Sequence, residues 1–201
     1  NSSAPTLPAQ PQGVAVFTKN VTGLLPSTTY YFSAKATNSG GTSWGVTQSF
    51  ITSAVIAPPT ITTSPATSVT TTTATLNGNV TATGGENPTV TVYWGDNDGG
   101  QGVWDNSSAP TLPAQPQGVA AFTKNVTGLS PSTTYYFSAK ATNSGGTSWG
   151  TTQSFTTSAV IVAPTVTTST ATSVTTTTAT LNGNVTATGG NDPTVTVYWG
   201  T

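Results

Sequence analysis

Small or apolar residues alternate with polar residues along several stretches of this chain, with a period of two. In residues 73–80 the first kind occupies one face of a predicted strand: Ala74, Leu76, Gly78 and Val80. This period is typical of a strand with one buried face. The same reasoning predicts six strands, at 14–21, 28–38, 44–52, 60–64, 73–80 and 89–94, with counterparts one repeat further along, and turns rich in Gly, Asn and Pro between them.

The chain contains a long internal repeat. The fifteen residues that begin at Asn1 return at Asn106, which gives a period of 105 residues. The overlap holds 96 pairs of positions, of which 11 differ, among them Leu25/Ser130 and Glu86/Asn191. A period near 100 residues is too long for one turn of a solenoid and fits one β-sandwich per repeat. The expected fold is therefore all-β, with one β-sandwich in each repeat of 105 residues.

Proline-containing segments at 53–64 and 158–169 predict the linkers between domains. They divide the chain into the C-terminal half of one sandwich (1–56), a complete sandwich (57–161) and the N-terminal half of the next (162–201). Half a sandwich cannot bury its apolar face alone. We expect either a window of a longer covalent array or completion of each half by a neighbouring copy. Both versions give a head-to-tail string of sandwiches, a type of contact that generates filaments.

The segment LLPSTTYYFSAKATNSGG resembles the late strands of a fibronectin type III domain. The matching positions are Leu24, Pro26, Thr28, Tyr30, Phe32, Ala34, Ala36, Asn38 and Gly41. The resemblance implies that Tyr30 and its counterpart Tyr135 are tyrosine-corner residues, each with a hydroxyl bonded to nearby backbone. It implies that the expected all-β fold consists of tandem immunoglobulin-like or fibronectin type III-like β-sandwiches. It also implies a bacterial type of secreted or surface protein, in which such modules act as spacers, stalks or adhesive repeats.

The tryptophans depart from the pattern of that family. The family keeps a Trp on its second strand, where this chain has Gly78, while Trp94 and its counterpart Trp199 lie on the third strand. We expect Trp94 and Trp199 to be core residues, with Gly78 leaving space for Trp94. This placement resembles the immunoglobulin-like arrangement.

Composition excludes many kinds of chemistry. The chain has no His, Cys or Met and only 4% charged residues, with a net charge of −1. It therefore lacks the commonest general base, a thiolate nucleophile and disulfides. No acid–base carboxylate pair recurs in each copy, so we expect no enzyme activity, cofactor or metal. The low charge argues against nucleic acid as a partner, and no run of apolar residues is long enough to span a membrane.

Three local features have a plain interpretation and an alternative one. The DNDGG stretch at 96–100 is read as a hairpin turn or as the start of a calcium loop that lacks its later ligands. Lys19 and Lys35 are read as ordinary lysines or as donors of an isopeptide bond to an Asn, a reaction that needs a nearby carboxylate such as Glu86. Trp44, Trp94 and Trp104 are read as packing residues or as a platform for sugars.

Six Asn-x-Ser/Thr triplets are acceptor sequons for N-glycans in a secreted host: Asn1, Asn20, Asn79, Asn106, Asn125 and Asn184. The sequence as a whole predicts a non-catalytic subunit or segment of an extracellular or cell-surface filament or stalk. Its expected partners are identical copies of itself, head to tail, and surface glycans. The alternative is a spacer or carbohydrate-binding accessory module of a secreted adhesin or polysaccharide-degrading enzyme.

Overall fold

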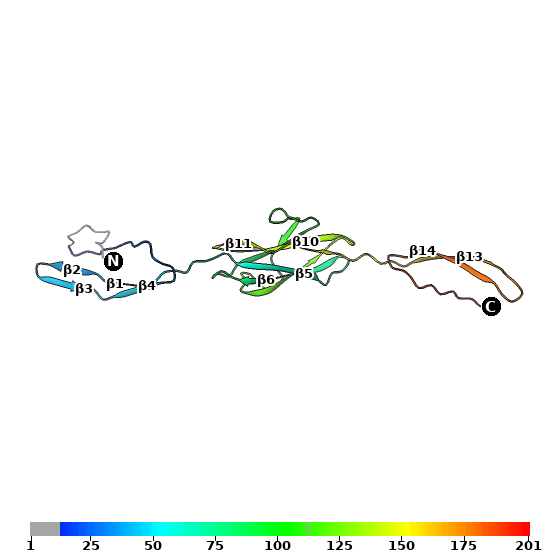
Figure 1. Ribbon diagram of the computed structural model, residues 1–201, viewed down its shortest axis with the longest axis horizontal. Helices are drawn as coiled ribbons and strands as arrows, with labels where there is room; N and C mark the ends of the chain where they lie inside the picture. The colour runs from blue at the N-terminus through cyan, green and yellow to red at the C-terminus, as the bar shows by residue number, and fades with distance from the viewer. Residues whose placement is uncertain (1–12, 112) are drawn as a thin grey trace. The chain divides into compact units, whose positions relative to one another are not determined.

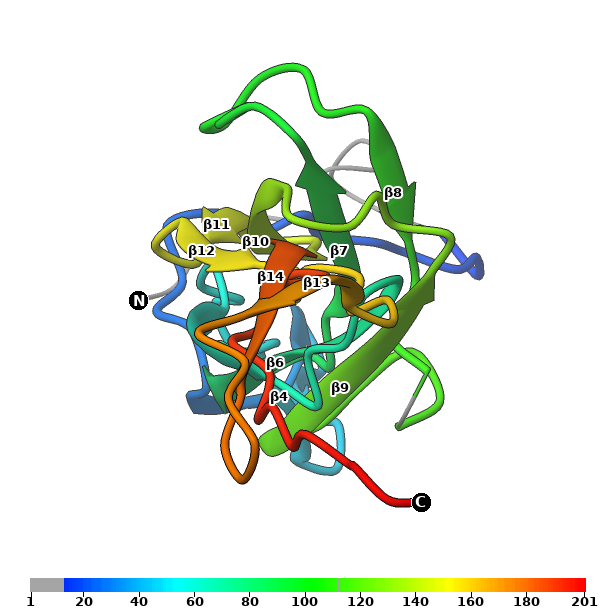
Figure 2. The same cartoon turned by 90° about the vertical axis from the view of Figure 1, so that its right-hand side faces the viewer.

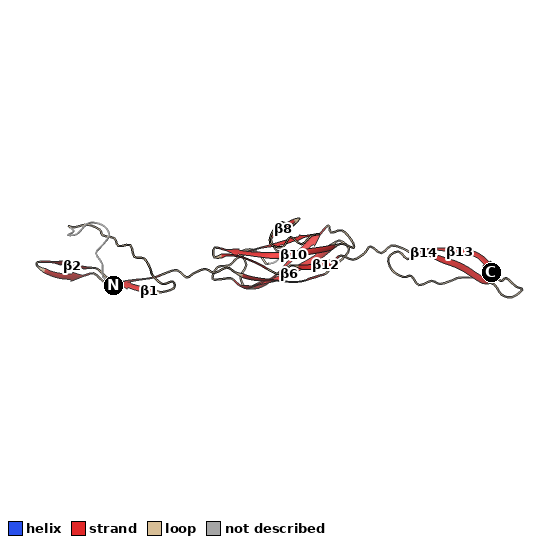
Figure 3. Cartoon of the chain, turned by 45° about the horizontal axis from the view of Figure 1, so that its top comes forward, coloured by secondary structure: helices blue, strands red, loops and turns tan. Residues whose placement is uncertain are grey.

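The computed structural model describes residues 13–111 and 113–201, and these form strands, turns and extended linkers without any helix (Figures 1 and 3). The chain divides into two compact units between Ala57 and Pro58. We call residues 13–57 the N-terminal segment, 58–157 the central sandwich and 162–201 the C-terminal segment, and each is described by itself.

The central sandwich consists of two antiparallel sheets. The first has the order β5-β6-β9, with β5 at Thr60–Thr67, β6 at Thr73–Ala82 and β9 at Ala120–Thr127. The second has the order β11-β10-β7-β8, with β12 also paired to β10. Its strands are β7 at Thr89–Gly95, β8 at Asn106–Ser108, β10 at Thr134–Asn143, β11 at Gly146–Trp149 and β12 at Gln153–Thr156. This pairing makes an immunoglobulin-like β-sandwich. Its fourth strand, β8, pairs with the third strand, β7, and not with the fifth, β9.

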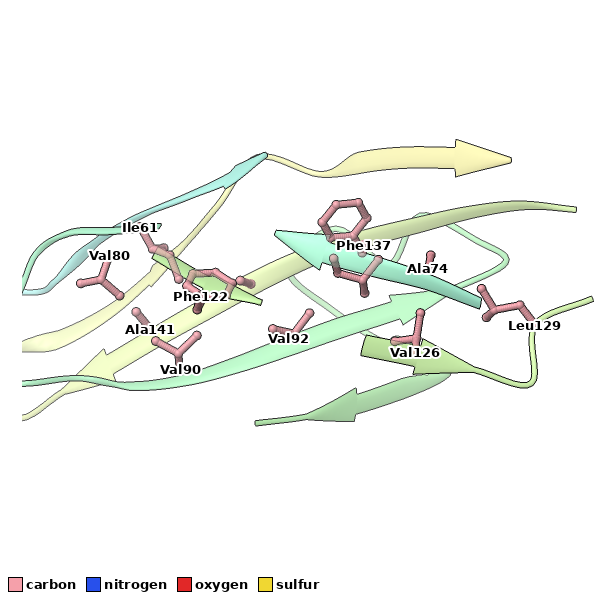
Figure 4. Packing of buried hydrophobic residues seen from close by; sticks show 12 residues of the cluster. Ile61, Ala74, Val80, Val90, Val92, Phe122, Val126, Leu129, Phe137 and Ala141 are labelled. Atoms are coloured by element: carbon pink, nitrogen blue, oxygen red, sulfur yellow. The ribbon is translucent and has the colours of Figure 1, made fainter. Parts of the chain in front are cut away.

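The core lies between the two sheets. On β6, every second residue from Ala74 to Val80 is buried, as the alternation predicts. Val90 and Val92 of β7 and Phe137 of β10 face them from the second sheet, and Figure 4 shows these side chains meeting between the layers. β-branched and aromatic side chains favour such a pleated, half-buried surface, and burial of their apolar area stabilises the fold.

Gly78 accommodates Phe122 and not Trp94, so the sequence-based expectation was wrong. Gly78 lies opposite Phe122 in the β6–β9 pair. A Cβ at Gly78 would lie 2.2 Å from Cζ of Phe122 and 2.5 Å from the carbonyl oxygen of Thr62, both too close for any side chain. Trp94 is half-buried and packs against the edge of the core, while its counterpart Trp199 is exposed.

The N-terminal segment contains four short strands instead of the three expected. They are β1 at Thr29–Phe32, β2 at Lys35–Asn38, β3 at Gly41–Trp44 and β4 at Gln48–Ile51, paired β1-β4 and β2-β3. The strand expected at 14–21 is absent, although its counterpart β9 is present. β9 forms along β6, and the N-terminal segment has no strand of that kind.

The absence of a neighbouring strand also explains why β1 and β2 are two strands and not one. In the central sandwich β10 is continuous because β7 pairs with Tyr136–Thr142 and bridges the gap between β12 and β11. Without a counterpart of β7, the backbone at Ser33 and Ala34 has, among the described residues, only the bond from the N–H of Gly45 to the carbonyl of Ala34, and the strand breaks there. A strand is therefore stable here only where a neighbouring strand completes its hydrogen bonds.

The C-terminal segment forms a single hairpin of β13 at Thr165–Thr172 and β14 at Thr180–Ala187. The strand expected at 194–199 is absent, because its counterpart β7 depends on β10 and β8. The short strand β8 was not predicted, and the loop that joins it to β7 stands out from the central sandwich in Figure 2.

Replacing Val80 by Ala should lower the free energy of unfolding of the central sandwich by about 2 kcal/mol. The side chain is fully buried, so two methyl groups are lost and a cavity remains. Val119→Ala is the matched control, because Val119 is exposed and its truncation should change stability by less than about 0.5 kcal/mol. Urea denaturation followed by tryptophan fluorescence measures both, and equal effects would contradict the assigned core.

Candidate functional site

Two acidic side chains of the loop 96–105, those of Asp98 and Asp105, accept local hydrogen bonds. Asp98 Oδ1 accepts from the backbone N–H of Gly100 at 2.9 Å and from the hydroxyl of Thr152 at 3.2 Å. Asp105 Oδ2 accepts from the backbone N–H of Asp96 at 3.0 Å. Within residues 13–111 and 113–201 there is no group of three or more His, Cys, Asp or Glu that could hold a metal. The loop thus has the bonding of an ordinary turn.

The lysines of the central sandwich pair with hydroxyl groups and aromatic rings. Lys124, the counterpart of Lys19, shares the inner face of β9 with Phe122. Its Nζ donates to Ser108 Oγ at 3.0 Å and lies 5.9 Å from the ring centre of Trp94. This position at the open edge between the sheets gives the ammonium group a polar partner and a cation–π contact.

Lys140, the counterpart of Lys35, lies on the outer face of the second sheet. Its Nζ is 5.4 Å from the ring centre of Tyr93 and 5.6 Å from that of Trp149. Lys35 lies over Trp44 in the same way, at 5.7 Å. The carboxylate of Glu86 accepts from the backbone N–H and the hydroxyl of Ser144.

The three tryptophans considered as a sugar platform have different surroundings. Trp94 packs against the core, Trp104 lies half-buried in the loop 96–105 and donates its indole N–H to the carbonyl of Gly100 at 3.1 Å, and Trp44 is exposed under Lys35. The structure therefore shows contacts that hold each ring locally.

Both tyrosines singled out by the family resemblance bond to nearby backbone. The hydroxyl of Tyr135 accepts from the backbone N–H of Ser130 at 3.0 Å, and that of Tyr30 accepts from Leu25 at 2.8 Å. Each ring also stacks on a phenylalanine, with 5.8 Å between ring centres. This is the hydrogen bond of a tyrosine corner. It forms in the N-terminal segment too, because its donor lies in the turn just before the tyrosine's own strand, five residues from the tyrosine.

Four of the six sequons lie on strands: Asn79 on β6, Asn106 on β8, Asn125 on β9 and Asn184 on β14. Asn79 is half-buried, whereas Asn20, Asn106, Asn125 and Asn184 are exposed, and Asn1 lies outside the described residues. Asn125 Oδ1 accepts a hydrogen bond from the hydroxyl of Thr75 at 3.1 Å.

The most prominent feature is a pair of apolar faces that nothing in their own segment covers. In the N-terminal segment, the inner face is formed by Phe17, Val21, Phe32 and Phe50. Phe17 is 46% exposed where its counterpart Phe122 is 2% exposed, and Phe32 is 57% exposed where Phe137 is 1% exposed. Exposed apolar groups of this extent mark an interaction surface.

The C-terminal segment shows the same contrast. Its inner face consists of Val166, Leu181, Val195, Val197 and Trp199. Leu181 is 50% exposed, whereas Leu76 at the same place in the central sandwich is fully buried. Sequence reasoning anticipated these faces from the alternation and the repeat. The two inner faces are the candidate functional site of this chain.

No helix long and apolar enough to cross a membrane occurs among the residues that the structure describes.

Comparisons with known proteins give low similarities. A scan against models of known families finds no match, and a search of curated proteins finds none. Among solved structures, the chain is similar to the sensor domain of the anti-sigma factor RsgI4 of Pseudobacteroides cellulosolvens in a short form (20% identity, TM-score 0.40, 52% of this chain and 99% of that chain). A long form of the same domain has 21% identity and a TM-score of 0.39, and the match covers 53% of this chain and 96% of that chain. The domains A168 to A170 of titin have 17% identity and a TM-score of 0.34, and the match covers 64% of this chain and 40% of that chain. The fold assignment rests on the strand pairing and core of the structure itself.

Replacing Tyr135 by Phe should destabilise the central sandwich by about 1 kcal/mol, because one side chain–backbone hydrogen bond is lost while the stacked ring is kept. Tyr136→Phe is the control: its hydroxyl has no hydrogen-bond partner in the described part of the chain, so stability should stay the same. Thermal or urea unfolding of the two variants measures the difference, and a Tyr135→Phe variant as stable as Tyr136→Phe would argue against the corner.

Proposed function

We propose that this protein is a non-catalytic structural segment of an extracellular or cell-surface filament or stalk, built from β-sandwiches joined head to tail. The observation that carries the proposal is that strands of the complete central sandwich recur in both flanking segments, a different part in each, and that both flanking segments have uncovered inner faces. When the uncovered face of one half-sandwich binds the complementary half of a neighbour, the contact is head to tail and extends the string.

The bonding of the polar groups supports a structural role. The loop carboxylates, lysines and tryptophans described above are engaged in turns and local ring contacts, and the chain has no His or Cys. An enzyme site needs convergent acid–base or nucleophilic groups in a cleft. A role in holding domains at a fixed spacing needs only stable sandwiches and stiff connections between them.

The linker that enters the central sandwich is held against it. Pro59 is fully buried, and its carbonyl accepts a hydrogen bond from the hydroxyl of Ser148 at 2.6 Å. Pro58 lies close to Gly146, the first residue of β11. Because the prolines fix their own backbone angle and lie against the sheet, the first residues of the central sandwich are anchored to it.

An antibody raised against the central sandwich should label filaments or stalks on the surface of intact cells that make this protein. Immunogold electron microscopy measures this, and protease added to unbroken cells should remove the label, because the proposed location is outside the cell. Label confined to the cell interior would contradict the proposal.

The accessory-module alternative predicts retention on insoluble polysaccharides. The structural proposal predicts that the wild-type chain passes through such material, with Trp44→Ala and Trp104→Ala behaving alike. Retention that either substitution abolishes would favour the carbohydrate-binding alternative.

A further inference from the structure

The N-terminal and C-terminal segments carry opposite parts of one sandwich. The C-terminal segment contains the sequences equivalent to β5, β6 and β7, of which the first two form strands as β13 and β14. The N-terminal segment contains the sequences equivalent to β9 to β12, of which the last three form strands as β1 to β4. In the central sandwich these two groups of strands pair with each other along β6–β9 and β7–β10. The structure thus contains a template of how the inner face of one segment covers the inner face of the other.

We infer that the C-terminal segment of one chain binds the N-terminal segment of a second copy of this chain, and that the two together fold into a sandwich like the central one. This inference rests on the proposed function and specifies its partner and contact. The β6–β9 pairing can be transferred to the two segments by replacing each β6 residue with its counterpart one repeat later and each β9 residue with its counterpart one repeat earlier. This places Thr180 opposite Asn20 and Gly183 opposite Phe17. The same transfer of the β7–β10 pairing places Trp199 opposite Phe32, as Trp94 lies opposite Phe137.

The fit at Gly183 is the most specific contact of this interface. In the central sandwich the ring of Phe122 occupies the space that a Cβ on Gly78 would fill. The two segments keep both partners, as Phe17 and Gly183. Phe17 is exposed in its own segment and acquires a pocket when β14 of another chain lies beside it.

The two segments together contain every element of the core. They lack counterparts only of residues 97–105, which belong to the loop between β7 and β8 and contribute no residue to the buried cluster. Of the 11 positions that differ between the repeats, most are exposed in the central sandwich, such as Ala121, Ser130 and Thr151. With a net charge of −1 per chain, little repulsion opposes the contact.

Single cysteines test the contact, because the natural chain has none. The hydroxyl of Thr75 bonds to the side chain of Asn125 on the outer face of the central sandwich, so the same two positions are close enough for a disulfide. We expect a mixture of Asn20→Cys and Thr180→Cys variants of the 201-residue chain to form the mixed disulfide upon mild oxidation, at a yield well above that of random thiol pairing. Because the two cysteines are on different chains, this bond joins separate molecules.

Two controls keep the test specific. Thr186→Cys, at the far end of β14, should pair with Asn20→Cys only at the random level. Adding Phe17→Ala to the Asn20→Cys chain should lower the mixed yield at least tenfold, whereas Val46→Thr, at an exposed position whose counterpart is Thr151, should leave it unchanged.

A mixed-disulfide yield no higher than random for Asn20→Cys with Thr180→Cys would overturn the inference. So would a yield that Phe17→Ala leaves unchanged. Surface labelling of stalks would still hold in that case, because a single long chain could supply the same neighbours covalently. The failure of this contact and the failure of the proposed function are therefore distinguishable.

Discussion

Mutual coverage of two apolar sheet faces is the interaction on which the rest of this structure depends. A single sheet of this kind leaves its inner face in water, and two packed sheets remove both faces from it. The repeat provides an internal comparison, because nearly the same residues occur with and without an opposing sheet. Phe137 and Leu76 are buried in the central sandwich, while Phe32 and Leu181 remain exposed. The difference comes from the partner strands and not from the local sequence.

The same dependence decides where strands form. β10 is one strand because β7 bridges it, and its counterpart breaks into β1 and β2 where no such neighbour exists. The tyrosine corner behaves differently: it forms in both copies because its donor is five residues before the tyrosine and its stacked ring is on the strand paired to the tyrosine's own. Local contacts thus hold each half in shape, and the contact between halves builds the core. A half-sandwich that keeps its local contacts while its inner face stays uncovered fits the proposed completion by a second copy.

Much of the fold was predictable from alternation and repetition. The inner positions of β6 and the all-β class follow from a period of two and from the turn residues. Alternation could not reveal which ring fills the space at Gly78, since that depends on the cross-strand register of β6 and β9. Nor could it predict β8, a three-residue strand that exists only as the edge partner of β7. The uncovered faces were predictable because the repeat shows which half of a sandwich each segment holds, whereas their depth of exposure needed coordinates.

Sedimentation of the unmodified chain over a range of concentrations tests the central claim most directly. The account predicts a series of species at multiples of 20.2 kDa that lengthens as concentration rises, because the exposed face of the C-terminal segment is proposed to bind that of the N-terminal segment of another copy. A single species of 20.2 kDa at every concentration would contradict it.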